Sequence, residues 1–394
     1  MPAAPVGTPP ASPPAGVASA SLRRAARRAL ALALSALFLT GACARGPARA
    51  EGVSAQPTVH SCRQIVPADA VVRWVEPEAR RDRDALSRWC DTIGPILIQP
   101  LVVQPPVAPI DRLAIVTWNV HVGSGDVSGF VARLRRGEFT GGTPIEHFVL
   151  LLQEAYRRDP AVPSRVPRGF PAPSRIAAAV GRAPDIANVA RALGVSVFYV
   201  PAMRNGIAAV DAEDRGNAIL STLDLHDLVV VELPMERQRR TAAVATVRAR
   251  SSVGSPWTLR VANVHLDTSL AITRGGPFAA RRRQAHALIA ALREPDELPT
   301  VLAGDFNTWW GLREPAVSIL RSAFPQTPAT PALETYRGPL AVSAQLDYIF
   351  VRGALEGVSV QRLSSRFGSD HYPLLAVLDV GVRTADAPPR PVAH

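Results

Sequence analysis

Nine polar residues whose side chains can bind a metal or transfer a proton stand where apolar runs of this sequence begin or end. They comprise two asparagines, one glutamate, two histidines and four aspartates: Asn119, Glu154, His265, Asp267, Asp305, Asn307, Asp347, Asp370 and His371. Taken singly, Asp and Asn are typical of turns and helix caps, because their side chains hydrogen-bond the nearby backbone. Nine such residues beside apolar runs are better explained by strands that bring them to one edge of a sheet.

These residue types together suit the hydrolysis of a phosphate ester. The reaction needs a hard cation to neutralise developing negative charge, and Mg²⁺ prefers carboxylate ligands such as Glu154. It needs a base that works near neutral pH, a role for a histidine oriented by a carboxylate, here His371 and Asp347. It also needs donors to the phosphoryl oxygens, and the sequence supplies neutral ones: Asn119, Asn307 and His265.

Short apolar runs bounded by glycine, proline or aspartate predict the strands that position this set. Strands are expected at residues 113–120, 147–154, 195–202, 216–222, 241–249, 257–267, 299–307, 346–353 and 371–380. Helices are expected at residues 128–136, 174–192 and 278–293. The order of these elements is neither a strict alternation of strands and helices nor all strand, which favours paired mixed sheets covered by helices.

The composition is that of a globular chain with proline-rich ends. Its 394 residues are 47% hydrophobic and 20% charged, enough to bury the core of one large domain or two smaller ones. The 37 prolines gather at the two ends and in residues 157–173. We therefore predict four parts: a signal peptide and leader at 1–50, an N-terminal extension at 51–104, a catalytic domain at 105–382 and a disordered tail at 383–394.

The N-terminus has the pattern of an export signal. "RRAARR" at 23–28 is a positive region, and the apolar run that follows at 29–44 is too short to span a bilayer well. Cleavage after "ARA" at 48–50 would give a secreted or periplasmic protein, the route we favour. Cleavage before Cys43, where "LTGAC" is similar to a bacterial lipobox, would give a lipoprotein. Both routes predict an exported bacterial protein.

Part of the formal net charge of +11 comes from this leader. All 44 basic residues are arginines, and without residues 1–50 the chain keeps 38 of them against 33 acidic residues, a net charge of +5. This charge supports an anionic substrate without requiring one, because a solvated surface with surplus arginine would give the same value.

The cysteine content predicts one disulfide. Of the three cysteines, Cys43 lies in the leader, which leaves Cys62 and Cys90 to pair in an oxidising compartment; two free thiols are the alternative. The bond would close a loop of about 29 residues and contribute about 3–4 kcal/mol in the chain-entropy model. Its distance in sequence from the nine polar residues indicates a structural role.

Seven motifs make the sequence resemble the endonuclease/exonuclease/phosphatase superfamily, which has the deoxyribonuclease I-like fold. In that family's order they are "TWNV" (117–120), "LLQE" (151–154), "GNAILS" (216–221), "NVHLD" (263–267), "GDFN" (304–307), "LDYIF" (346–350) and "SDHYPL" (369–374). Together they cover about residues 111–380. The resemblance implies an α/β (α+β) four-layer sandwich: two packed mixed β-sheets flanked by helices, with a metal site at the top.

The resemblance also implies which residues bind the metal and the phosphate. Glu154 would be the principal ligand of Mg²⁺, with Mn²⁺ or Ca²⁺ as alternatives, and Asn119 and Asp370 would lie beside the ion. Asn307 would bind the phosphate together with Asn119. One departure is His121, which stands where repair-type relatives carry an aspartate that helps with the metal; this weakens a reading as an abasic-site repair enzyme.

The remaining implied roles concern proton transfer and the transition state. Asp305 would position or activate the attacking water, or assist proton transfer. Asp347 would orient His371 as the general base. His265 would bind substrate and stabilise the pentavalent transition state as a hydrogen-bond donor.

Three features could select a substrate, and each has a plainer explanation. Trp309 and Trp310 could stack on a base or press on a lipid surface, but aromatic residues beside a sheet are more often packing. The arginines at 239–240 and 281–283 could approach a phosphate or lie on a solvated face. The segment 157–173 could be a substrate-selecting loop or a surface loop without such a role.

The leading hypothesis is an exported Mg²⁺-dependent phosphodiesterase that acts as a monomer, with nucleic acid as the favoured substrate. A sphingomyelinase-like lipid phosphodiesterase is the first alternative, and a phosphomonoesterase the second. A catalytically silent binding module is the alternative from another class, against which every required residue type is present. Membrane contact is expected only if Cys43 is lipidated or the substrate is a lipid.

Overall fold

The computed structural model describes residues 62–380 apart from 69, 102–108, 165, 167–169, 171–184, 207–211, 270–274, 294–297, 329–332 and 354. The predicted leader with Cys43, the tail at 383–394 and part of the proline-rich segment 157–173 lie outside the described residues. In the part of the chain that is described, no helix is long and apolar enough to cross a membrane.

One mixed sheet has seven strands. In sheet order they are β14 (Glu356–Arg362), β15 (Leu374–Asp379), β3 (Arg112–Asn119), β4 (Phe148–Arg158), β6 (Glu213–Ser221), β5 (Ser196–Arg204) and β2 (Leu97–Gln99). Strands β3 and β4 pair in parallel, and the other neighbours are antiparallel. The nearly continuous apolar residues of β3 and β4 fit strands that are covered on both faces.

A second mixed sheet has six strands. In sheet order they are β1 (Arg73–Val75), β7 (His226–Glu232), β8 (Thr241–Arg250), β9 (Pro256–His265), β10 (Thr300–Asp305) and β13 (Asp347–Arg352). Strands β9 and β10 are parallel, as are β1 and β7. The described residues of the extension predicted at 51–104 thus contribute β1 to this sheet and β2 to the other.

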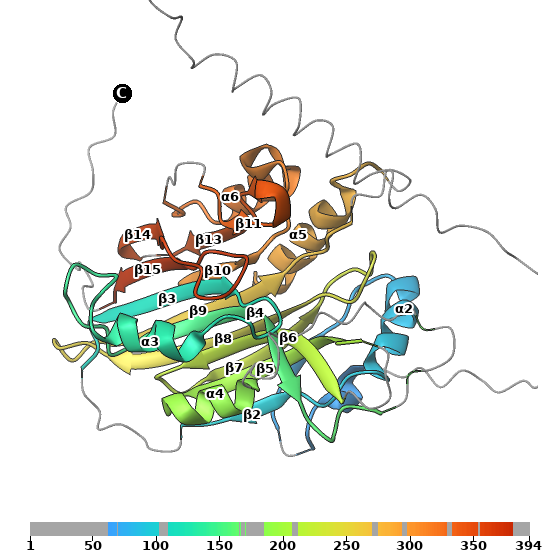
Figure 1. Cartoon of the computed structure of the whole chain (residues 1–394), viewed down its shortest axis with the longest axis horizontal. Coiled ribbons are helices and arrows are strands. Elements are labelled where there is room, and N and C mark those ends of the chain that lie inside the picture. The colour runs from blue at the N-terminus through green and yellow to red at the C-terminus, as the bar shows by residue number, and fades with distance from the viewer. Residues whose placement is uncertain are drawn as a thin grey trace, which may run out of the picture. The chain divides into compact units, whose positions relative to one another are not determined.

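The two sheets pack face to face, and helices cover their outer faces (Figure 1). An inner core joins residues of both sheets, among them Ile115 and Leu151 from one and Val261 and Val301 from the other. Helices α3 (Val127–Arg135) and α4 (Ile186–Leu193) pack on the seven-stranded sheet, while α5 (Ala279–Ala291) and α6 (Pro315–Ala323) pack on the six-stranded one. This is the four-layer α/β sandwich that the sequence predicts.

The nine predicted strands are all present, with their ends shifted by a few residues. The predicted helices correspond to α3, α4 and α5, although residues 174–184 of the second lie outside the described part. Sequence analysis missed α2 (Arg80–Cys90), α6, the strands β1, β2, β7 and β14, and a small hairpin of β11 (Tyr336–Arg337) with β12 (Ser343–Ala344). It also missed three short 3₁₀ turns: η1 (Cys62–Ile65), η3 (Gly311–Arg313) and η4 (Pro339–Ala341).

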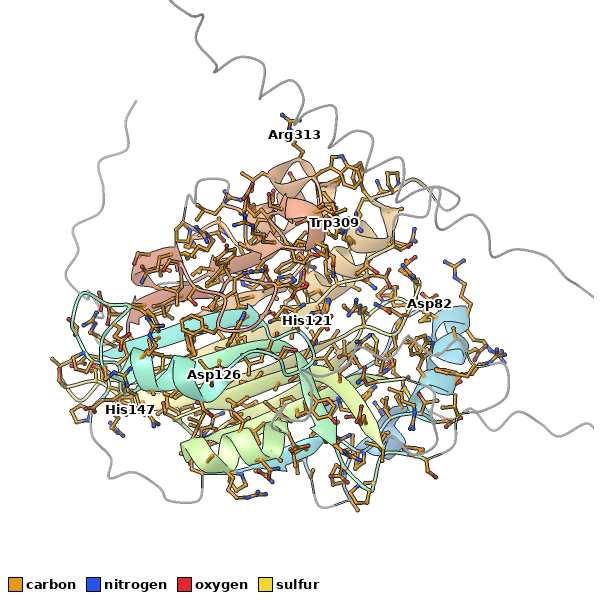
Figure 2. All side chains as sticks on the ribbon, viewed as in Figure 1. Asp82, His121, Asp126, His147, Trp309 and Arg313 are labelled. Atoms are coloured by element: carbon orange, nitrogen blue, oxygen red, sulfur yellow. A yellow bond between two sulfur atoms is a disulfide. The ribbon has the colours of Figure 1, made fainter. Side chains whose placement is uncertain are left out.

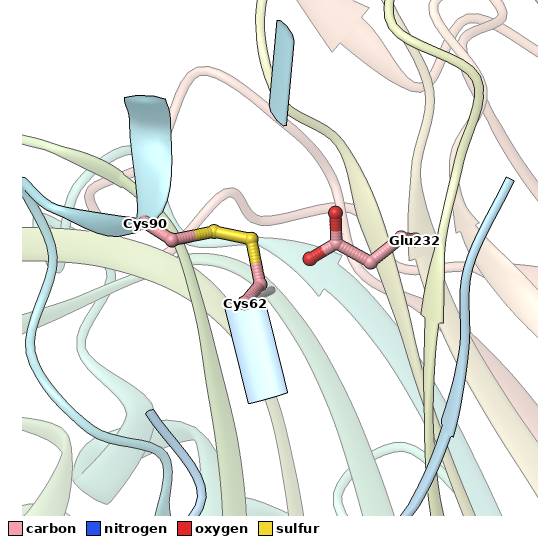
Figure 3. A group of neighbouring side chains, drawn as sticks. All are labelled: Cys62, Cys90 and Glu232. Atoms are coloured by element: carbon pink, nitrogen blue, oxygen red, sulfur yellow. A yellow bond between two sulfur atoms is a disulfide. The ribbon is translucent and has the colours of Figure 1, made fainter. Parts of the chain in front are cut away.

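Cys62 and Cys90 form a disulfide, the pairing that the sequence predicts (Figure 3). It joins η1 to the end of α2, and both cysteines belong to the core between the sheets. The carboxylate of Glu232 lies close to the two sulfurs. Because both sulfurs are used in the disulfide, this group is no metal site, and Glu232 binds Arg239 instead.

Candidate active site

Three of the predicted site residues lie side by side at the ends of adjacent strands. In the six-stranded sheet Asp305 of β10 pairs in register with His265 of β9 and with Asp347 of β13. This requires β9 and β10 to approach closely at the residue before Asp305. A Cβ at Gly304 would fall on the carbonyl oxygen of Val264, so the glycine of the "GDFN" motif permits the approach.

Asp305 is the centre of the cluster and connects the two sheets. Its Oδ2 accepts a hydrogen bond from Asn119 Nδ2 at 3.0 Å, across from β3 of the other sheet. The same oxygen lies 3.4 Å from His265 Nε2 and 3.8 Å from His371 Nε2. Its Oδ1 accepts from the backbone N–H of Asn307 at 2.9 Å. All five residues are buried, so these contacts are only weakly screened by solvent.

His371 is held in place from three directions. Its Nδ1 lies 2.8 Å from Asp347 Oδ2, the contact expected of a histidine oriented by a carboxylate. Trp118 Nε1 donates to the backbone carbonyl of His371 at 3.2 Å. The Ser369 hydroxyl donates to the Asn119 carbonyl at 2.6 Å and accepts from the His371 N–H at 3.1 Å. These bonds attach the His371 segment to the end of β3.

The three central titratable groups have shifted pKa values. Burial lowers the pKa of His371, but the charge of Asp347 and its hydrogen bond outweigh burial and raise that pKa to about 10. Burial raises the pKa of Asp305 to about 7, against the opposing effect of His371. Burial, followed by the charge of Arg240, lowers the pKa of His265 well below its usual value. His265 is therefore a neutral donor, while Asp305 and His371 form a coupled pair that can exchange a proton.

Glu154 does not end its strand, as the sequence suggested, but lies inside β4. The pairing of β4 with β6 shifts between Leu152 and Ala155, which is a β-bulge, and Glu154 has a positive φ of 52°. Bulges redirect a side chain without ending the strand, and they are frequent beside active sites. The buried Oε2 of Glu154 has no hydrogen-bond partner among the described residues. An unpartnered buried carboxylate oxygen fits a residue that binds a cation.

Asp370 and His121 lie together near Glu154. His121, labelled in Figure 2, places Nδ1 3.3 Å from Asp370 Oδ1. The hydrogen bond to Asp370 raises the pKa of His121 despite burial, and the charge of Glu154 acts in the same direction. Burial raises the pKa of Asp370, but His121 and His371 together bring it below its usual value. The two predicted carboxylate ligands thus both act on His121, and carboxylate oxygens suit a hard divalent cation.

Asn119, Asn307 and Asp267 already have partners within the protein. Asn119 Oδ1 accepts from the His121 N–H at 3.0 Å, and Asn307 Nδ2 donates to the Leu266 carbonyl at 2.9 Å. Asp267 accepts from the backbone N–H groups of residues 237, 238 and 269. Asp267 therefore organises neighbouring loops, and no described hydrogen bond joins it to Asp305 or His371.

A buried amide pair supports the bulge from the opposite sheet. Gln153 Nε2 donates to Asn263 Oδ1 at 2.7 Å. Asn263 Nδ2 donates to the carbonyls of Leu152 and Ala218, at 2.8 and 2.9 Å. Asn263 belongs to β9 and the other three residues to β4 and β6, so the pair connects the sheets directly behind Glu154.

Replacing Asn263 by leucine is expected to lower the free energy of unfolding by about 2–4 kcal/mol, because two carbonyls and an amide lose partners in a buried place. Chemical denaturation would measure the loss. Asn188→Ala, on the exposed face of α4, is the matched control and should change stability by less than about 0.5 kcal/mol. Equal stability of the two variants would show that the amide pair does not support the bulge.

Three of the five arginines at 239–240 and 281–283 form ion pairs with glutamates of the protein. Arg239 binds Glu232, Arg281 binds Glu314 and Arg283 binds Glu236. Arg282 lies exposed on α5. Arg240 is buried without an ion pair to any described carboxylate, and it interacts electrostatically with Asp267, Glu154 and Asp305.

An aromatic chain leads from His371 to the surface. The Tyr336 ring lies 5.0 Å from the His371 ring, and Trp309 packs edge-on against Tyr336 at 5.5 Å. Trp309, labelled in Figure 2, is 36% exposed, and Trp310 is 45% exposed while it packs on Phe278. Packing is thus confirmed for both tryptophans, each of which still presents apolar surface, while a contact with a base or a lipid stays a prediction.

Sequence reasoning missed four residues that complete the site: Trp118, Arg215, Tyr336 and Ser369. Trp118 and Ser369 lie inside the quoted motifs "TWNV" and "SDHYPL", so the motifs could have pointed to them. Arg215 stands immediately before "GNAILS" and carries no signal of its own. Tyr336 reaches the site through a bridge between its backbone and that of His371, which no local pattern indicates.

Comparison with known proteins identifies one family and several similar folds. The model of the Endonuclease/Exonuclease/phosphatase family matches residues 116–371. Truncated TDP2 from Caenorhabditis elegans is 15% identical, with 68% of this chain and 97% of that chain covered and a TM-score of 0.40. The human Nocturnin catalytic domain with bound sulfate anion is 17% identical, with 70% and 99% covered and a TM-score of 0.43.

An endonuclease/exonuclease/phosphatase family protein from Leptotrichia buccalis is 14% identical, with 67% of this chain and 98% of that chain covered and a TM-score of 0.44. Nothing about the substrate of this chain follows from such distant similarities. A comparison with curated proteins finds no match.

Proposed function

Because the chain belongs to the endonuclease/exonuclease/phosphatase family, we propose that it is an exported, divalent-metal-dependent phosphodiesterase with nucleic acid as the favoured substrate. The convergence of buried polar side chains on Asp305 carries this proposal, since Asn119 comes from one sheet and His265 from the other. The predicted export signal and the net charge of +5 without residues 1–50 favour an external polyanion. Members of this family are typically phosphoester hydrolases.

The proposed proton transfer uses the coupled pair of Asp305 and His371. Asp305 would accept a proton from the attacking water, and His371, whose Nε2 lies 3.8 Å from Asp305 Oδ2, would exchange that proton with it. Asp347 would keep the imidazole in one orientation through its 2.8 Å contact with Nδ1. His265, as a neutral donor, would stabilise the charge that develops on the phosphoryl oxygens, while Asn119 and Asn307 would position the substrate phosphate.

Glu154 and Asp370 would hold the divalent cation, with Mg²⁺ preferred and Mn²⁺ or Ca²⁺ as alternatives. When bound, the ion would supply positive charge that stabilises the pentavalent phosphorus. The unpartnered Oε2 of Glu154 and the ionised Asp370 support this assignment. Both carboxylates also favour a positive charge on His121, the residue that stands where repair-type relatives have an aspartate.

Hydrolysis assays on the secreted form, residues 51–394, would test the proposed function. The substrates are supercoiled plasmid, single-stranded RNA, sphingomyelin and a bis-aryl phosphodiester, each with Mg²⁺ and with chelator. Metal-dependent nicking of plasmid or cleavage of RNA is the expected result. No hydrolysis of any of the four would contradict the phosphodiesterase and favour the silent binding module.

A lipid phosphodiesterase is the second candidate because apolar side chains stand exposed near the site. Trp309, Trp310, Leu312 and Leu340 are each at least 36% exposed, and Trp309 leads through Tyr336 to His371. Exposed tryptophan and leucine are suited to the interface of a lipid bilayer. Cleavage of sphingomyelin, with plasmid and RNA left intact, would establish this candidate and exclude the nuclease.

A further inference from the structure

Two buried arginines border the candidate active site without a carboxylate partner. Arg215, in β6, is 7% exposed, and Arg240, directly before β8, is 4% exposed. Arg215 Nη2 contacts only the Met203 sulfur at 3.5 Å, and its Nη1 has no partner in the described structure. With the Gln238 amide turned so that its oxygen faces the guanidinium, that oxygen accepts from Arg240 Nη2 at 2.5 Å.

Three other buried arginines among the described residues form ion pairs. Arg157 binds Asp214 and Tyr199 shares that carboxylate, while Arg239 and Arg281 form ion pairs with Glu232 and Glu314. In these three cases a carboxylate lies beside the guanidinium that burial removes from water. Arg215 and Arg240 depart from this pattern among the described residues, and both are next to the proposed catalytic cluster.

The fold brings the two arginines together from opposite sheets. Asn217 of β6 donates from Nδ2 to the carbonyl of Thr241 at 2.7 Å, and these residues are near neighbours of Arg215 and Arg240 in sequence. Both arginines act electrostatically on His265, and Arg240 also interacts with Glu154 and Asp305. The pair therefore lies beside the proposed catalytic cluster.

An unpaired buried guanidinium is costly, since arginine stays charged and loses its hydration. The planar N–H donors of a guanidinium match the oxygens of a phosphate. Binding of phosphate would therefore offset the cost of burying the guanidinium. We propose that Arg215 and Arg240 form an anion-binding subsite that holds phosphoryl oxygens of the substrate. This inference rests on the proposed function for the identity of the substrate, but not for the binding of phosphate itself.

Two phosphates could occupy this subsite. One is the phosphate that is cleaved, and the other is a neighbouring terminal phosphate on the same substrate. Both present the same oxygens to the guanidinium groups. The two arginines therefore support the binding of a phosphoryl group, but they do not distinguish the cleaved phosphate from a terminal one. Substrates that differ only in a terminal phosphate separate the two.

Binding of inorganic phosphate, measured by calorimetry in the presence of chelator, tests the subsite without turnover. Arg240→Gln and Arg215→Gln are each expected to weaken binding by about 10–100-fold, the loss of a charge-assisted contact. Arg240→Lys keeps the charge but not the fork and should bind more tightly than Arg240→Gln. Arg282→Gln, which removes an exposed arginine of α5, should bind phosphate as the unchanged protein does.

The alternative is that the arginines only balance the acidic cluster. In that case Arg240→Gln would bind phosphate with unchanged affinity, or Arg240→Lys and Arg240→Gln would lose thermal stability without any difference in phosphate binding. Either result overturns the subsite. Because no substrate is cleaved in this measurement, a failure of the proposed function leaves its outcome intact.

A pair of dinucleotides, one with and one without a 5′-phosphate, identifies which phosphate is held. Equal losses of kcat/KM for Arg240→Gln on both would place the cleaved phosphate at the subsite. A loss confined to the phosphorylated dinucleotide would place the terminal phosphate there. No loss on either substrate would overturn the proposal.

Discussion

Replacement of His371 by alanine is expected to reduce turnover by about 10²–10⁴-fold, the usual contribution of a positioned acid or base. The imidazole lies between two carboxylates: its Nδ1 is 2.8 Å from Asp347 Oδ2, and its Nε2 is 3.8 Å from Asp305 Oδ2. Without it, Asp305 loses the partner with which it would exchange the proton. The kcat of the purified variant on its best substrate measures the effect.

Two controls separate catalysis from folding in this experiment. His286→Ala removes an exposed histidine on α5 and should leave turnover unchanged. Added imidazole should partly restore the activity of His371→Ala, because the variant leaves a buried space next to Asp347. Unchanged turnover of a folded His371→Ala protein, shown by an intact thermal transition, would remove His371 from the mechanism.

The sequence predicts the layers of this fold well, because their signals are local. The apolar runs of β3 and β4 are long and continuous, and each begins or ends near a turn residue. Strand β14, Glu356–Arg362, mixes polar and small residues and gives no comparable signal. Strand β7 was missed although Leu228–Leu233 is almost entirely apolar, so the error there lies in the interpretation and not in the sequence.

The positions of polar residues at strand ends predict most of the residues that belong to the site. They do not predict the contacts that these residues make with one another. That Asp305 should lie beside His265 and Asp347 depends on the register of three strands, which a single sequence does not specify. The β-bulge that turns Glu154 out of β4 is likewise a property of pairing with β6. Partners of individual arginines were unpredictable for the same reason, since Arg239 and Arg240 are adjacent in sequence yet only Arg239 meets a carboxylate.

Glu154→Gln is expected to raise the Mg²⁺ concentration for half-maximal activity by at least about 10-fold, equivalent to about 1.4 kcal/mol of binding free energy. The amide keeps the size of the side chain but removes the charge that a hard cation requires. A direct titration with Mn²⁺, followed by calorimetry, provides a second readout that does not depend on turnover. Glu146→Gln, at an exposed glutamate, is the matched control and should leave both titrations unchanged.

The same experiment decides between two places for the ion. Asp347 Oδ1, like Glu154 Oε2, is buried without a partner among the described residues, and Asp305, Asp347 and His371 lie close enough to share a cation. Yet Asp347 Oδ2 already holds His371, and a cation there would oppose the charge of the imidazole. If the ion binds at Glu154, Glu154→Gln shifts the metal titration and Asp347→Asn lowers turnover without shifting it. The opposite pattern would place the ion among Asp305, Asp347 and His371 and leave Glu154 without its assigned role.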